Sequence, residues 1–196
     1  MEKEGNLNIS ISNLSLSGKP GIFFGSISIC IIYLISFLTN QYSSGIGVSF
    51  LPISFFEILL VVIIVLFLVV SYLTITQINK KRRIKLGVIG WDSSSKIIRR
   101  VFLLMLLLFF IATFIIYKTG FIKYIVPLSL CFYGLACIVI KKLTNGPAFL
   151  LGIFFILQAF LCLLQPDIMF LFWGVSFGLG HIAYGILGKR KTHTHN

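Results

Sequence analysis

The chain has 196 residues, of which 58% are hydrophobic and only 11% are charged, and its formal net charge is +12. A soluble domain carries about 25% charged residues, so this composition excludes an ordinary soluble domain. In a soluble protein so high a charge would suggest a nucleic-acid partner. Here the Lys and Arg residues stand between hydrophobic segments. They are placed to set helix orientation and to meet anionic lipid head groups, so we expect no nucleic-acid partner.

Apolar runs of about 18 residues recur along the chain and are typical of transmembrane helices. The run 101–116 does not alternate at every second residue, which argues against a transmembrane β-barrel. We therefore predict an all-α integral membrane protein with six transmembrane helices in three hairpins, forming one membrane domain over residues 21–188. The predicted spans are 21–39, 52–74, 101–117, 124–140, 148–164 and 168–188.

The segments outside the spans are polar. Residues 1–20 contain acids and lack an apolar core, so they are not a secretory signal peptide, and we expect a mobile cytoplasmic tail. Residues 77–100 are predicted to form a basic cytoplasmic loop along the membrane surface, and residues 189–196 a basic C-terminal tail. The cysteines lie inside apolar runs without a CxxC pair, so we expect free buried thiols. They are Cys30, Cys131, Cys137 and Cys162.

Basic residues are unequally divided between the two predicted sides of the membrane. The side that holds both termini carries fifteen Lys and Arg residues, whereas the other side carries only Lys118 and Lys123. The positive-inside rule therefore predicts that both termini are cytoplasmic. The strongest cluster is expected to contact anionic head groups. Its members are Lys80, Lys81, Arg82, Arg83, Arg99 and Arg100.

The last apolar stretch, 168–188, carries a stripe of small residues. At 100° per residue, the stripe contains His181 and several glycines, and a second small-residue face lies almost opposite. Such faces let neighbouring helices approach closely on both sides, which predicts the central helix of the bundle. The predicted helix-packing residues on the first face are Gly174, Gly178 and Gly185.

A short internal similarity links spans four and six. Tyr133-Gly-Leu-Ala-Cys-Ile138 and Phe177-Gly-Leu-Gly-His-Ile182 stand 44 residues apart, and both spans end in basic residues. One interpretation is a set of parallel hairpin repeats in which span six is the specialised copy. The other is chance similarity in an apolar sequence.

Two ionisable residues lie inside predicted spans, where burial of charge is costly. Glu57 is either a proton or cation site or a carboxylate that reaches the external interface. His181 is either a proton sensor or a neutral side chain that donates a hydrogen bond across a helix contact. On predicted depths they lie about 12 Å apart. The candidate polar membrane sites are Glu57, His181, Gln158 and Tyr33.

The sequence offers no assembled catalytic or metal-binding set. His193 and His195 form an HxH pair without an acid or a cysteine nearby, so no metal site is predicted. No P-loop, HExxH or GxSxG motif occurs. We expect no catalytic residues, no cofactor and no enzymatic activity.

The last hairpin reads LLGIFFILQAFLCLLQPDIMFLFWGVSFGLGHIAYGIL, with a proline turn between two glycine-bearing helices. It resembles the hairpins of small six-helix bacterial membrane proteins of the HdeD type, which are linked to acid resistance. The resemblance implies a multi-pass protein of the bacterial inner membrane with a stress or envelope role, and it brings no catalytic residues.

These features predict a non-enzymatic accessory or stress-related envelope protein. It would work by packing against lipid, a membrane-protein partner or further copies of itself. The alternative is a small transporter or proton-coupled permeability protein that uses Glu57 and His181.

Overall fold

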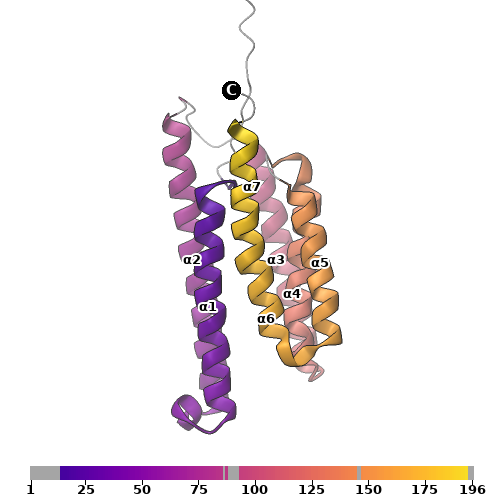
Figure 1. Cartoon of the computed structure of the whole chain (residues 1–196). Helices are drawn as coiled ribbons and strands as arrows, with labels where there is room; N and C mark the ends of the chain where they lie inside the picture. Colours follow the sequence, from indigo (N-terminus) through magenta and orange to yellow (C-terminus); the bar gives the residue numbers. More distant parts are fainter. Residues whose placement is uncertain (1–13, 86, 88–92, 145–146, 194–196) are drawn as a thin grey trace, which may run out of the picture.

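The computed structural model describes residues 14–85, 87, 93–144 and 147–193, and this part of the chain contains helices and no strand (Figure 1). The α-helices are α1 (Lys19–Ser43), α2 (Ile53–Lys85), α3 (Ser93–Lys118), α4 (Ile125–Val139), α5 (Ala148–Leu164), α6 (Met169–Gly174) and α7 (His181–His193). A π-helical segment, η5 (Val175–Gly180), joins α6 to α7. Short 3₁₀ turns are η1 (Gly47–Phe50), η2 (Ile122–Tyr124), η3 (Ile140–Lys142) and η4 (Pro166–Ile168).

Five helical stretches are long and apolar enough to cross a membrane, which confirms the prediction of an all-α membrane protein. They are Lys19–Ser43, Ile53–Lys85, Ser93–Lys118, Ile125–Lys142 and Pro166–Gly188. The predicted fifth span is the shorter apolar helix α5, whose 17 residues extend about 26 Å at 1.5 Å per residue. A hydrocarbon core is about 30 Å thick, so the count of six spans depends on α5.

Two helices extend into the predicted basic loop 77–100. α2 continues to Lys85, and α3 begins at Ser93. Lys and Arg are good helix formers, so the charged end of α2 prolongs the helix beyond its apolar part. Ser, the residue type at 93–95, is favoured at helix starts. Within this loop the sequence predicts Trp91 at the membrane interface, and that residue lies outside the described part of the chain.

Residues 14–18 pack against the bundle, unlike the mobile tail predicted over 1–20. Ser15 and Ser17 are buried, and Asn79 Nδ2 on α2 donates a 2.8 Å hydrogen bond to the carbonyl oxygen of Ser15. The amide of Gly18 donates a 2.9 Å bond to the carbonyl oxygen of Gly185 on α7. This segment therefore connects α2 to α7 before α1 begins. Residues 1–13 lie outside the described part of the chain.

Asn79→Ala is expected to weaken the attachment of residues 14–18. The substitution removes the donor to a buried carbonyl, and an unsatisfied buried polar group costs about 1–3 kcal/mol. Local opening should therefore rise roughly 5- to 150-fold. The rate of proteolysis or amide exchange within residues 14–18 measures it. The exposed neighbour Gln77 supplies the matched control Gln77→Ala, and equal rates in the two variants would contradict the expectation.

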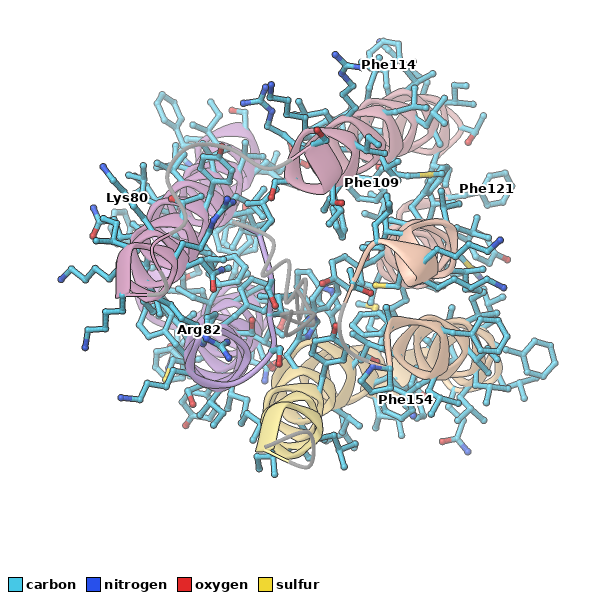
Figure 2. All side chains as sticks on the ribbon, turned by 90° about the horizontal axis from the view of Figure 1, so that it is seen from above. Lys80, Arg82, Phe109, Phe114, Phe121 and Phe154 are labelled. Carbon is cyan, nitrogen blue, oxygen red and sulfur yellow. The ribbon has the colours of Figure 1, made fainter. Side chains whose placement is uncertain are left out.

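The helices are arranged around a ring when viewed along the bundle (Figure 2). The continuous helix α6–η5–α7 packs against α1, α4 and α5, whereas α2 packs on α1 and α3 packs on α4. The last apolar stretch has helices against both of its small-residue faces, as predicted, but it is a member of the ring and does not stand at its centre. We keep the name central helix for α6–η5–α7. The largest buried cluster lies between α4, α5 and α7. Its members are Leu130, Cys137, Ala148, Leu151, Phe155, Ala159, Cys162 and Tyr184.

Two helix crossings are closed by pairs of glycines. Where α4 crosses α5, a Cβ added at Gly152 would lie 2.7 Å from both the carbonyl oxygen of Gly134 and Cγ1 of Ile138. Real Cβ atoms do not approach so closely, so both backbones meet here because a side chain is missing. Where α1 crosses η5 and α7, a Cβ at Gly25 would lie 2.5 Å from the carbonyl oxygen of Gly178 and 2.7 Å from Cγ1 of Ile182.

The two crossings use equivalent residues of the internal similarity. Gly134 and Ile138 correspond to Gly178 and Ile182 at the 44-residue spacing, and each pair receives the glycine of a helix that runs the opposite way. In the reverse direction, a Cβ at Gly134 would meet Ile156 and one at Gly178 would meet Ile29, each four residues beyond the partner glycine. Shared packing at matching positions favours the repeat interpretation over chance.

Candidate functional site

His181 forms a buried polar centre at the start of α7. Its side chain is fully buried, Nδ1 lies 3.0 Å from the carbonyl oxygen of Phe177, and Nε2 lies 2.6 Å from the hydroxyl of Tyr133 on α4. A carbonyl oxygen only accepts, so Nδ1 carries the hydrogen and donates it. Nε2 of the neutral ring then accepts from Tyr133. One neutral tautomer therefore satisfies both nitrogens.

Aromatic rings from several helices surround the imidazole. The ring centroid of Phe24 on α1 lies 4.7 Å away, that of Phe155 on α5 lies 5.5 Å away, and that of Phe177 on η5 lies 5.9 Å away. The Tyr133 ring contacts both Phe155 and Phe177. Helices α1, α4 and α5 therefore meet the central helix at this one side chain. The arrangement can fix their mutual positions through a single polar contact.

The three predicted packing glycines lie before, within and after the π-helical segment η5, and all face α1 or Gly18, the residue just before α1, but they approach these residues to different degrees. An added Cβ at Gly178 would clash with Ile29 of α1, and one at Gly185 would lie 2.8 Å from the carbonyl oxygen of Gly18. At Gly174 the nearest heavy atom is 3.7 Å away, an ordinary contact. Gly178 and Gly185 are thus at close contacts, and Gly174 is not.

The second small-residue face is also used. A Cβ at Gly180 would lie 3.2 Å from the Phe154 ring of α5, and Ser176 is fully buried. The central helix is therefore approached by α1 on one side and by α5 on the other, as the two-faced pattern predicted.

Glu57 lies far from His181. The neighbouring residue Phe56 stacks on Tyr42 near the end of α1, with ring centroids 4.1 Å apart, whereas Phe24 near the start of α1 contacts His181. The stretch of α1 from Phe24 to Tyr42 is about 27 Å long at 1.5 Å per residue. This is more than twice the separation expected from the sequence. The structure does not bring Glu57 and His181 together.

The other predicted polar sites do not join Glu57. Tyr33 is 74% exposed on α1, and Gln158 lies half-buried on α5. Within the described residues, Oε1 of Gln158 is buried without a hydrogen-bond partner. Tyr133 and Asn79 are not among the predicted polar sites, although each is a polar residue within or beside an apolar run. Tyr133 also stands opposite Phe177 in the internal similarity, which is the signal that could have paired it with span six.

The predicted head-group residues gather at one end of the bundle, where α2 ends and α3 begins (Figures 1 and 2). Lys80, Lys81, Arg99 and Arg100 are exposed there. Arg82 is half-buried and its Nη1 donates a 3.4 Å bond to the carbonyl oxygen of Ser17, and Arg83 is buried.

We call this end of the bundle the basic end and define it by the exposed cations of α2 and α3. They are Lys80, Lys81, Lys85, Lys96, Arg99 and Arg100. The acidic residues in the described part of the chain are Glu57 and Asp167, and both lie towards the opposite end. Positive charge is also favoured at a helix C-terminus such as that of α2.

The described residues form neither a metal-binding cluster nor a disulfide. No group of three or more His, Cys, Asp or Glu side chains is placed to hold a metal ion there, and the four cysteines are free thiols. Cys137 and Cys162 are buried as expected, whereas Cys131 is half-buried and Cys30 is exposed on α1, contrary to the expectation that all four are buried. No protein-family model, curated protein or solved structure matches this chain.

Proposed function

We propose that the protein is a non-enzymatic accessory protein of the membrane and that its basic end binds anionic lipid head groups. The observation that carries the proposal is the concentration of exposed Lys and Arg where α2 ends and α3 begins, at one end of the bundle. Each basic side chain near an anionic surface contributes about 1 kcal/mol, so a cluster of them binds strongly without any catalytic group. The apolar faces of the long helices provide the contact with lipid.

The side of the membrane follows from the same charges. By the positive-inside rule, the basic end and both termini are cytoplasmic in this proposal. The resemblance of the last hairpin to HdeD-type proteins supports a place in the bacterial inner membrane and a role in the envelope under stress.

Anionic lipid is expected to stabilise the purified protein more than zwitterionic lipid does. In detergent, titration with phosphatidylglycerol should raise Tm, because a ligand that binds the folded state stabilises it by mass action. Phosphatidylcholine should raise Tm less. The charge-removing variant Lys80→Gln with Lys81→Gln should lose part of the difference, and added salt should reduce it through screening. Thermal unfolding followed by circular dichroism measures these shifts.

The control removes the same charge at the other end of the bundle, through Lys118→Gln with Lys123→Gln. This variant should keep the preference for phosphatidylglycerol. Equal stabilisation by the two lipids, or equal losses in the two variants, would overturn the proposal.

A second candidate function, proton-coupled transport, is favoured by the buried polar pair of Tyr133 and His181, which joins α4 to α7. Proteoliposomes with an imposed pH gradient test it. Proton or solute flux that disappears in both Glu57→Gln and His181→Ala would support transport. Flux that is undetectable in the native protein would leave lipid binding as the better proposal.

A further inference from the structure

The three helical hairpins stand side by side in the ring, and we call the line between two neighbouring hairpins a seam. Two of the three seams are closed by glycines. The hairpins are α1 with α2, α3 with α4, and α5 with α6–η5–α7. The α4–α5 seam is closed at Gly134 and Gly152, and the α7–α1 seam at Gly25 and Gly178. The third seam lies between α2 and α3, which are neighbours in the ring (Figure 2). Neither helix contains a glycine, and in the described chain they share no extended contact.

Both helices that border the third seam are largely uncovered. α2 packs on α1 through residues such as Phe67, whose ring centroid lies 5.6 Å from that of Phe24. α3 packs on α4 through Phe102 and Phe109, which contact Tyr133 and Phe132. Beyond these contacts the two helices expose large apolar side chains. Examples are Val61, Val62, Leu66, Val69 and Leu73 on α2, and Leu103, Leu104, Leu107, Ile111 and Phe114 on α3.

Burial on these two helices is concentrated near the basic end. Ser71, Ile75, Asn79 and Arg83 form a buried stripe at four-residue spacing in the last part of α2, and Ser95 and Ile98 are buried in the first part of α3. Phe56, near the start of α2, is its other buried residue. α3 has no buried residue after Ile98. At least part of the buried stripe of α2 packs against residues 14–18, since Asn79 bonds to Ser15, so both helices remain uncovered along their membrane-spanning parts.

Exposed cations stand at the basic end of both helices that border the seam. Lys85 ends α2, and Lys96 and Arg100 lie in the first two turns of α3. An anionic phospholipid fits this arrangement, because its phosphate can meet the cations of the basic end while its acyl chains contact the exposed apolar side chains of α2 and α3. A second copy fits less well, because association in the same orientation would place the like charges of two basic ends side by side.

We propose that one anionic phospholipid occupies the α2–α3 seam. Its phosphate binds among Lys85, Lys96 and Arg100, and its acyl chains lie along the exposed apolar side chains of α2 and α3. The lipid occupies the one seam of the three at which no pair of glycines brings the two helices into contact. This site rests on the proposed function and narrows it from a basic surface to one stoichiometric site.

Native mass spectrometry of the full-length protein tests the site after titration with phosphatidylglycerol or phosphatidylcholine in detergent. The native protein should retain one phosphatidylglycerol per chain in preference to phosphatidylcholine. Lys85→Gln with Lys96→Gln should weaken that retention roughly 30-fold, from the loss of two basic contacts. Lys85→Arg with Lys96→Arg keeps both charges and should restore retention, which separates a charge effect from a folding defect.

The matched control is Lys141→Gln with Lys142→Gln, which removes two exposed charges beside the closed α4–α5 seam. Retention within about twofold of the native value is expected for this control. Equal loss in both double variants would overturn the seam site but leave the basic end as a general lipid-binding surface. Equal retention of the two lipids by the native protein would overturn the proposed function as well. A stable dimer of the native protein that retains no phosphatidylglycerol would assign the seam to a second copy instead.

Discussion

Gly25→Ala is expected to lower the free energy of unfolding by about 2 kcal/mol. The added Cβ would lie 2.5 Å from the carbonyl oxygen of Gly178 and 2.9 Å from the amide nitrogen of Ile182. Both are backbone atoms, so no rotamer change relieves the overlap and the two helices must separate. Overpacking costs about 1–3 kcal/mol, and backbone overlap places this case at the upper end. The better helix propensity of alanine returns about 1 kcal/mol.

Gly174→Ala is the matched control on the same stripe. Its added Cβ would have its nearest neighbour at 3.7 Å, Cγ2 of Ile32, so the packing cost should be near zero. The change in helix propensity is the same, and this variant should be neutral or stabilised by up to about 1 kcal/mol. Thermal unfolding in detergent compares the two. Similar losses of Tm in both variants would show that the glycines act through something other than this crossing.

This contrast also shows how far a helical wheel can be trusted. The wheel placed Gly174 and Gly178 on one face, and both do face α1 despite the π-helical segment at Val175–Gly180. A wheel gives direction only, so it could not show that Gly178 is in close contact with α1 whereas Gly174 is not. The wheel also could not name the partner. Gly25 lies about 150 residues away in sequence, so its contact with Gly178 follows from the ring order of the helices.

The sequence predicted which segments are helical better than it predicted how deep Glu57 and His181 lie in the membrane. The separation of Glu57 and His181 was counted from the ends of apolar runs, which gave about 12 Å. The helices are longer than those runs, with 25 residues in α1 and 33 in α2. A helix of that length exceeds the hydrocarbon thickness of about 30 Å and is free to tilt or slide against its neighbours. The separation of Glu57 and His181 follows only from the structure. Phe24 contacts His181 and Tyr42 contacts Phe56, the neighbour of Glu57, and both Phe24 and Tyr42 lie on α1.

Tyr133→Phe is expected to destabilise the protein by about 1–3 kcal/mol, because it removes the donor to a fully buried imidazole nitrogen. The ring is kept, so its contacts with Phe155 and Phe177 should survive. The effect should depend on His181. In a His181→Leu background the imidazole acceptor is gone, and the Tyr133 hydroxyl keeps only the thiol of Cys137, which is a weak acceptor. There the same Tyr133→Phe change should be neutral or stabilising.

A double-mutant cycle on thermal unfolding measures the coupling, which should lie within about 0.5–3 kcal/mol. Strong coupling would identify the pair as a polar tie between α4 and the central helix, because the two side chains would matter to stability only together. Additive losses would contradict that interpretation. They would point back to His181 acting alone, and flux through the Tyr133→Phe variant would then decide whether the imidazole serves transport.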